Sequence, residues 1–164
     1  NIRIFQKFRG EESGWSWLTE QQTNTFLVDR LFDYDIRNSA EVSEVNLIIS
    51  VSAEIAATRI HAVKSADIPT YVLRSSYQGF DAIKSPTDAN DFIRTFRCEA
   101  IEQIRQDFPK ISIINLFPAT PVCLPVRIGM NYLKNADVEW RMYNQRGEDG
   151  FMYALSIKGG NENE

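Results

Sequence analysis

Short apolar runs recur along the chain and are separated by longer segments of mixed character. Val45–Val51 is a near-continuous apolar run, as expected of a strand that is covered on both faces of its sheet. Thr70–Arg74 is a second β-like run, and three more follow at Ile111–Phe117, Val138–Tyr143 and Phe151–Ile157. The hydrophobic pattern therefore predicts five strands.

A long amphipathic helix is predicted between the second and third of these strands. Ser85 and Pro86 form a strong start signal, because serine is favoured at the N-cap and proline at the first helical position, and Asp88 follows in the first turn. Apolar residues then recur every four positions, which defines the face expected to be buried. These residues are Phe92, Phe96, Ala100, Ile104 and Phe108.

A further helix is predicted near the N-terminus. Thr19–Gln22 resembles a capping box, so we expect a helix from there to about Asp33 that buries Phe26, Leu27 and Leu31. The polar residues that follow are expected to form a loop before the first strand.

Two hydroxyl residues stand where predicted strands end. As N-caps, Ser52 and Thr120 predict helices that run to about residues 64 and 133. Pro125 would delete a backbone hydrogen bond within the second of these helices. Either the regular helix begins nearer Pro125 or its first turn is irregular.

Strands that alternate with helices are typical of an α/β fold with a largely parallel sheet. Two strand–helix units also resemble each other, since Val45–Ile60 aligns with Ile113–Ile128 without a gap and Ser52 then falls on Thr120. If this similarity reflects a duplication, the domain contains two nucleotide-fold halves with a composite cleft between them. The shared identities are few, so chance similarity is the alternative.

Composition and charge restrict the classes of function. The 164 residues suffice for one domain with a real core, and no apolar run approaches the roughly 18 residues that span a bilayer. The net charge of −4 argues against a broad electrostatic contact with DNA. Cys98 and Cys123 suggest neither a disulfide framework nor a metal cluster, which fits a reducing cytoplasm.

The sequence also supports predictions about the two ends of the chain. The N-terminus lacks the apolar region of a signal peptide and begins with Asn1 rather than Met, so we expect a processed chain or a piece of a longer one. The acidic tail at residues 159–164 is expected to be disordered.

Three motifs in the second half of the chain closely resemble the SAVED domain. Ile114–Pro121 (INLFPATP) resembles its strand end LFPA-x-P, Val126–Gly129 (VRIG) its glycine-bearing helix, and Glu139–Gln145 (EWRMYNQ) its aromatic strand. The resemblance extends outward to Asn46–Ser52 and Phe151–Ile157, and the LFPA-x-P element is a fairly specific feature.

This resemblance implies an α/β fold of two fused CARF-like halves of Rossmann type, with a mostly parallel sheet flanked by helices. SAVED domains are sensors in bacterial antiphage defence, in CBASS operons and in some type III CRISPR-linked systems. They bind cyclic di-, tri- or tetranucleotides, oligomerise and switch on a fused effector, which is a DNA nuclease such as an HNH endonuclease, a TIR NADase or a protease.

By the same resemblance, residues 1–158 are the sensor domain of a bacterial cytoplasmic protein. The ligand is a cyclic oligonucleotide, and no cofactor, metal, membrane contact or direct DNA binding is expected of this domain. His61 is the only histidine, and the sequence carries no HNH pattern and no Walker glycine loop. We therefore expect the effector to lie outside this chain.

The ends of the predicted strands supply the candidate ligand-binding residues. In open α/β sheets, ligands bind beyond the carboxyl ends of the strands, where helix N-termini favour phosphates and aromatic faces stack bases. The candidates are Ser50, Ser52, Ala53, Arg74, Ser75, Ser76, Tyr77, Phe117, Ala119, Thr120, Pro121 and Tyr143. Phe117 can instead be a core residue, and Tyr143 a packing residue with its hydroxyl at the rim.

The polar candidates, and the function itself, admit more than one interpretation. Ser52 and Thr120 can be helix caps alone, and Arg74 can be a surface charge that pairs with Asp81. A sensor without catalysis of its own is the leading hypothesis. Two competing hypotheses are a phosphodiesterase that cleaves its cyclic ligand, as ring nucleases do, and a purely architectural dimerisation domain.

Overall fold

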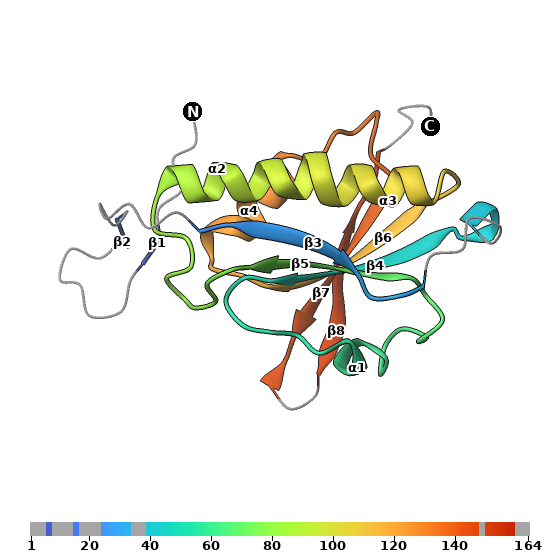
Figure 1. Ribbon diagram of the computed structural model, residues 1–164, viewed down its shortest axis with the longest axis horizontal. Coiled ribbons are helices and arrows are strands. Elements are labelled where there is room, and N and C mark those ends of the chain that lie inside the picture. Colours follow the sequence, from blue (N-terminus) through green and yellow to red (C-terminus); the bar gives the residue numbers. More distant parts are fainter. Residues whose placement is uncertain (1–5, 8–14, 17–23, 34–38, 148–149, 160–164) are drawn as a thin grey trace.

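The apolar runs form one six-stranded sheet, which the computed structural model shows in strand order β3-β5-β4-β6-β7-β8 (Figure 1). The structure describes residues 6–7, 15–16, 24–33, 39–147 and 150–159. The six strands are β3 (Phe26–Arg30), β4 (Glu44–Ser50), β5 (Thr70–Ser75), β6 (Ile113–Ala119), β7 (Glu139–Gln145) and β8 (Phe151–Ile157). Two smaller strands, β1 (Gln6–Lys7) and β2 (Trp15–Ser16), pair with each other, and a short 3₁₀ helix spans Ser39–Glu41. The five predicted strands are confirmed.

The sheet is largely parallel, as predicted. Strands β5, β4, β6 and β7 run in the same direction, and the edge strands β3 and β8 are antiparallel to their neighbours. The two strands that the sequence similarity aligned, β4 and β6, are adjacent in this sheet. Their register places Glu44 opposite Ile113, one residue away from the alignment that matched Val45 with Ile113.

One long helical rod covers one face of the sheet (Figure 1). It consists of α2 (Pro86–Thr95), a π-helical segment η2 (Phe96–Ile101) and α3 (Glu102–Asp107). Its predicted start is confirmed as a capping box, in which the Asp88 amide donates to Ser85 Oγ at 3.1 Å and the Ser85 amide donates to the Asp88 carboxylate at 3.0 Å. All five apolar residues of the predicted stripe are buried.

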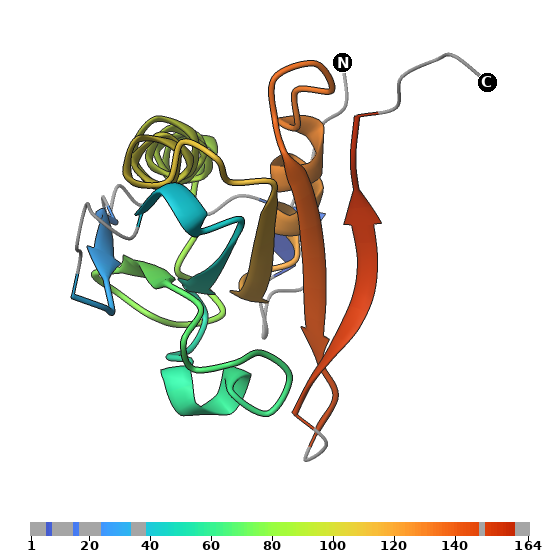
Figure 2. The same cartoon turned by 90° about the vertical axis from the view of Figure 1, so that its right-hand side faces the viewer.

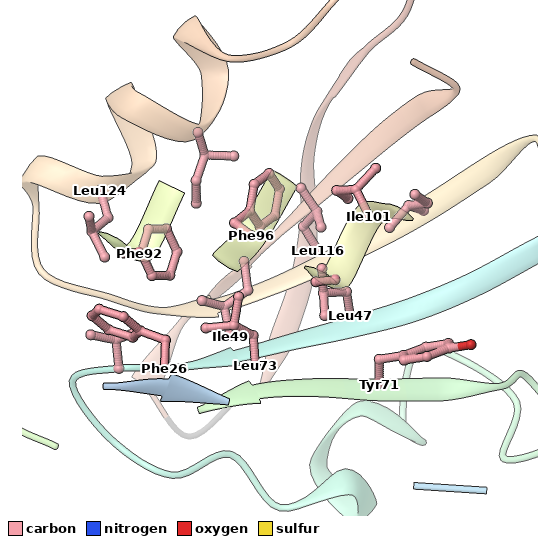
Figure 3. Packing of buried hydrophobic residues seen from close by; sticks show 14 of the residues in the cluster. Phe26, Leu47, Ile49, Tyr71, Leu73, Phe92, Phe96, Ile101, Leu116 and Leu124 are labelled. Atoms are coloured by element: carbon pink, nitrogen blue, oxygen red, sulfur yellow. The ribbon is translucent and has the colours of Figure 1, made fainter. Parts of the chain in front are cut away.

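The main core lies between this rod and the sheet (Figure 3). Phe92 and Phe96 point from the rod toward Ile49 and Leu73 on the strands, and helix α4 (Cys123–Met130) adds Leu124.

The far end of the rod is fastened by a buried carboxylate. Asp107 accepts two hydrogen bonds from the Arg30 guanidinium, at 2.6 and 2.8 Å, and one from the Tyr71 hydroxyl. Asp107 therefore ties the end of α3 to β3 and β5.

A second, smaller core occupies the opposite face of the sheet. It lies under the connection between β4 and β5, which carries the four-residue helix α1 (Ala57–Ile60) below the sheet in Figure 1. Its buried residues are Ile48, Ile55, Ile60, Val72, Phe117, Tyr143 and Phe151.

The prediction of a helix ending near Asp33 is wrong for the part of it that the structure describes. Its predicted start, Thr19–Gln22, lies outside the described residues. Residues 26–30 form edge strand β3, in which Phe26 is buried while Leu27 is 58% exposed. Leu31 is also exposed, so only one of the three expected core residues is buried. Pairing with β5 supplies the backbone hydrogen bonds that a helix would have made internally.

The predicted capping roles of Ser52 and Thr120 are also wrong. After β4 the chain continues as a loop, and α1 begins only at Ala57 with no side-chain cap. After β6 it also forms a short loop, and α4 begins at Cys123, again without a side-chain cap. Pro125 is the third residue of α4, where a backbone N–H has no partner within the helix, so it fits without a bend.

Most of the acidic tail predicted at residues 159–164 lies outside the described residues, which end at Gly159. Among the helices that the structure describes, none is long and apolar enough to cross a membrane.

Candidate functional site

The parallel strands β4, β5 and β6 end together at one edge of the sheet. In the sheet register Ser50 lies opposite Arg74 on one side and opposite Ala119 on the other. Three residues that are far apart in the sequence are therefore neighbours, as the strand-end argument predicted.

A cavity of about 220 Å³ opens at this edge, between the strands and the loop that leaves β4. Ser50, Val72 and Arg74 line it from the strands, Gln78 from the loop after β5, and residues 54–57 from the loop before α1. Its polar groups comprise a guanidinium, an amide, a hydroxyl and the Glu54 carboxylate, of which the first three suit an anionic or hydrogen-bonding ligand.

Arg74 is the cation of this cavity. Its Nε lies 3.3 Å from Asp29 Oδ2, within ion-pair distance, but no described residue makes a hydrogen bond to this buried N–H. The Asp81 carboxylate that the sequence offered as a partner is instead contacted by Tyr77 and Lys84. The interpretation of Arg74 as a partner of Asp81 is therefore wrong.

The loop after β4 brings further candidates to this edge. Ser50 Oγ accepts a hydrogen bond from the Ile55 amide at 3.2 Å and so closes the loop from inside. The amides of Val51 and Ser52 both donate to the Ala119 carbonyl, at 3.0 and 2.7 Å, which ties this loop to the end of β6. The Ser52 hydroxyl is shielded from solvent and has no partner among the described residues, whereas Ala53 is exposed.

The loop after β5 is organised by a residue that the sequence reasoning missed. Asn24 is buried and donates to the carbonyls of Tyr77, at 3.1 Å, and Ala82, at 2.9 Å, while its oxygen accepts from Ser76 Oγ and the Tyr77 amide. Ser75 Oγ donates to the Tyr77 carbonyl at 2.6 Å. The hydroxyls of Ser75 and Ser76 are thus engaged in holding the loop.

Tyr77 is the exposed aromatic residue of this loop. The residue is 42% exposed, and Lys84 Nζ lies above its ring at 5.3 Å from the centroid. Its hydroxyl donates to Asp81 Oδ1 at 2.9 Å, and this hydrogen bond raises the pKa of Tyr77 above its ordinary value. Asp81 and Lys84 therefore hold the Tyr77 ring in place on the loop that also carries Gln78.

Phe117 and Tyr143 lie beneath the edge rather than on it. Phe117 is fully buried, with its ring stacked on Tyr143 at 4.6 Å between centroids and edge-on to Phe151 at 5.3 Å. The core role considered for Phe117 is confirmed. At the end of β6, Pro121 is buried and Thr120 is half-buried.

A polar network under the sheet holds the returning part of the α1 connection. Lys64 pairs with Glu44, which also accepts from Asn115 Nδ2 at 2.8 Å, and Asn115 donates in turn to Asn46. Burial acts to raise the pKa of Glu44, but the hydrogen bonds from Lys64 and Asn115 outweigh it, so the pKa is lowered. This network fixes the connection whose first half lines the cavity.

No direct signal in the sequence marked Asn24, Gln78 or Glu54 as site residues. Asn24 fell in the segment predicted as a helix, and the other two are separated from the strand ends by several residues. Within the described ranges, no three His, Cys, Asp or Glu residues are placed to hold a metal ion.

Comparison with known proteins adds a family and a fold. Residues 1–157 match the family described as "SMODS-associated and fused to various effectors sensor domain", abbreviated SAVED. No curated protein matches the chain.

Similar solved structures include the Acinetobacter baumannii Cap4 SAVED/CARF-domain containing receptor with the cyclic trinucleotide 2'3'3'-cAAA, at a TM-score of 0.62 and 16% identity. The same receptor with 3'3'3'-cAAA gives a TM-score of 0.61 at 15% identity. In both cases the match covers 85% of this chain and 28% of the receptor chain. These likenesses show the fold, a mixed six-stranded sheet flanked by helices.

Proposed function

The chain belongs to the SAVED family of sensor domains, and from that premise we propose that it binds a cyclic oligonucleotide at the carboxyl edge of its sheet. The similar Cap4 receptors, whose structures hold cyclic trinucleotides, support this class of ligand.

The observation that carries the proposal is the cavity at the ends of β4 and β5. Arg74 brings a guanidinium there with one N–H free of hydrogen bonds to the described residues, next to the Ser50 and Gln78 side chains. Guanidinium groups bind phosphate through charge-assisted hydrogen bonds. A phosphate of the ligand would replace the exposed Asp29 carboxylate as the partner of Arg74.

The remaining candidates divide into contact and support roles in this proposal. Tyr77 offers a base-stacking face, and Ser52, Ala53, Ala119 and Thr120 form the rim of the neighbouring loops. The other candidates act as support beneath or beside the rim: Ser75, Ser76, Phe117, Pro121 and Tyr143.

The proposal extends to the role of the domain in the cell. Residues 1–158 would act as a sensor without catalysis in bacterial antiphage defence, within the cytoplasm. Ligand binding would promote oligomerisation and activate a fused nuclease, TIR or protease effector. The family description, which names fusion to various effectors, supports this role.

The test is a thermal-shift and calorimetric screen against cyclic di-, tri- and tetranucleotides. A true ligand at one hundred times its Kd should stabilise the chain by about 2.7 kcal/mol. Stabilisation by none of them would overturn the proposal and favour an architectural role. Chromatography of the ligand after long incubation separates sensing, which leaves it intact, from a phosphodiesterase, which yields linear products.

Arg74→Gln probes the proposed phosphate contact. Loss of a charge-assisted hydrogen bond of about 1.5–3 kcal/mol should weaken binding about 10- to 150-fold. Arg94→Gln is the matched control, because Arg94 is a surface arginine of α2, on the other face of the sheet, with ion pairs of 3.8 and 3.9 Å. Equal affinities of the two variants would exclude Arg74 from the site.

A further inference from the structure

A second cavity of about 320 Å³ lies between α4 and the β7–β8 hairpin, whose two strands stand side by side in Figure 2. Its walls are almost entirely apolar, with Pro118, Pro125, Ile128, Met142 and Leu155 among the lining residues. It shares no lining residue with the Arg74 cavity. Its volume falls within the range of small-molecule sites.

Gly129 keeps one wall of this slot open. Glycine is among the poorest helix formers, yet Gly129 is the seventh residue of α4. Its φ is not positive, and a Cβ built on it would meet no atom within 4 Å. Neither backbone conformation nor packing within the described chain requires a glycine here. The open space over Gly129 is therefore available to a molecule that approaches the helix closely.

The slot lies on the rod face of the sheet and the Arg74 cavity on the α1 face, but lining residues of both stand at the carboxyl edge of the sheet. Pro118 directly precedes Ala119 and Thr120 at the end of β6, and Asn144 is the penultimate residue of β7. The Asn144 side chain lines the slot, is exposed, and makes no hydrogen bond to another described residue. An amide can donate and accept at once, and asparagine pairs in this way with N6 and N7 of adenine.

We propose that this slot binds a nucleobase of the cyclic ligand, with a preference for adenine. The inference rests on the proposed function, because the ligand that presents the base is the cyclic oligonucleotide. The flat faces of the base pack between the proline and aliphatic side chains, and its polar edge meets Asn144. A ligand that lies across the carboxyl edge, from one face of the sheet to the other, then places a phosphate in the Arg74 cavity and a base in the slot.

The test uses a cyclic tri-adenylate in which one adenine is replaced by the fluorescent base 2-aminopurine. With wild-type protein we expect binding and a change in the 2-aminopurine emission. Gly129→Leu fills the slot and should weaken binding at least tenfold and abolish the emission change. Met130→Leu is the matched control, because Met130 is an exposed residue of the same helix outside the lining of the slot, and its affinity should stay within threefold of wild type. Gly129→Leu raises helix propensity and Met130→Leu leaves it nearly unchanged, so neither should lower the melting temperature.

Asn144→Ala tests the slot without altering the helix. Wild type should bind cyclic tri-adenylate more tightly than cyclic tri-inosinate, in which the N6 donor is lost, by about tenfold. The Asn144→Ala variant should discriminate less than threefold, and undiminished discrimination would overturn the preference for adenine.

The outcomes separate the two proposals. If wild type binds no cyclic oligonucleotide, the proposed function fails and the slot inference fails with it. If wild type binds and Gly129→Leu binds equally well with the same emission, only the slot inference is overturned. If Gly129→Leu changes the oligomeric state in light scattering but not the ligand affinity, the slot is a protein interface and the inference is likewise overturned.

Discussion

The buried hydroxyl of Ser52 leads to a prediction in which stability and binding change in opposite directions. Its Oγ is shielded from solvent and has no hydrogen-bond partner among the described residues. The backbone amide of Ser52, in contrast, donates to the Ala119 carbonyl at 2.7 Å and is retained in any variant. Ser52→Ala therefore removes an unpaired polar atom and leaves the local backbone contacts in place.

The size of the effect follows from the cost of burying a polar group. Mutational data place the burial of a hydroxyl without a hydrogen bond at about 1–3 kcal/mol. Ser52 as a whole is half-buried, so we take the lower end and expect Ser52→Ala to stabilise the chain by about 1 kcal/mol. For a domain of this size that corresponds to a rise in melting temperature of about 2–4 °C. If the hydroxyl contacts the ligand, affinity should fall about two- to tenfold.

Thermal and urea unfolding followed by circular dichroism measure the first effect, and calorimetry with the ligand found in the screen measures the second. Ser75→Ala is the matched control, because the buried Ser75 hydroxyl donates to the Tyr77 carbonyl at 2.6 Å and its loss should destabilise the fold by about 1 kcal/mol. A loss of stability in Ser52→Ala would refute the reasoning. Unchanged affinity would remove Ser52 from the binding site.

Two further predictions concern the thiols and the network under the sheet. Burial raises the pKa of Cys123 to about 11, so its thiol should not react in the folded chain. A thiol reagent should therefore label only the exposed Cys98 until the chain unfolds, and labelling of Cys123 in the folded chain would contradict this. The lowered pKa of Glu44 stabilises the fold above the ordinary value of 4.5, and this contribution is lost as pH falls through the lowered pKa. The urea midpoint should therefore drop less on acidification in Glu44→Gln than in wild type, and parallel pH profiles would argue against the Lys64–Glu44 pairing.

The features that sequence predicts well here are those fixed by local chemistry or a long periodic pattern. The start at Ser85 needs only residues within one helical turn, and the stripe from Phe92 to Phe108 has five members at a constant spacing. The central strand β4 is covered on both faces, so its apolar run has no competing interpretation. Edge strand β3 has five residues and an exposed leucine beside a buried phenylalanine, and that short pattern fits a helix face equally well.

The sequence predicted which strand ends form the candidate site, but not the hydrogen-bond and ion-pair partners of the residues there. The sequence indicated that Ser50, Arg74 and Ala119 end strands, and parallel topology then brings them together. The capping roles of Ser52 and Thr120 failed because a hydroxyl after a strand suits a cap or a loop, and the choice depends on distant backbone contacts such as the Ala119 carbonyl. The contacts of Asn24 and the ion pair between Arg74 and Asp29 require that residues 26–30 pair with β5 as strand β3. The sequence of this short segment did not predict that pairing.

The π-helical segment η2 affects the direction in which the side chains of the long rod face around its axis. In an α-helix each step of four residues advances by about 400°, so a stripe with period four drifts by about 40° per step and about 160° over four steps. The buried residues from Phe92 to Phe108 keep that period yet all face the sheet. The wider turn of η2, with its i→i+5 bonds, accommodates one extra residue and so removes about 100° of this drift. A one-residue deletion within η2 would therefore restore a regular α-helix with Asp107 still facing Arg30 and Tyr71, whereas the same deletion within α3 would rotate the last turn by about 100° and separate them.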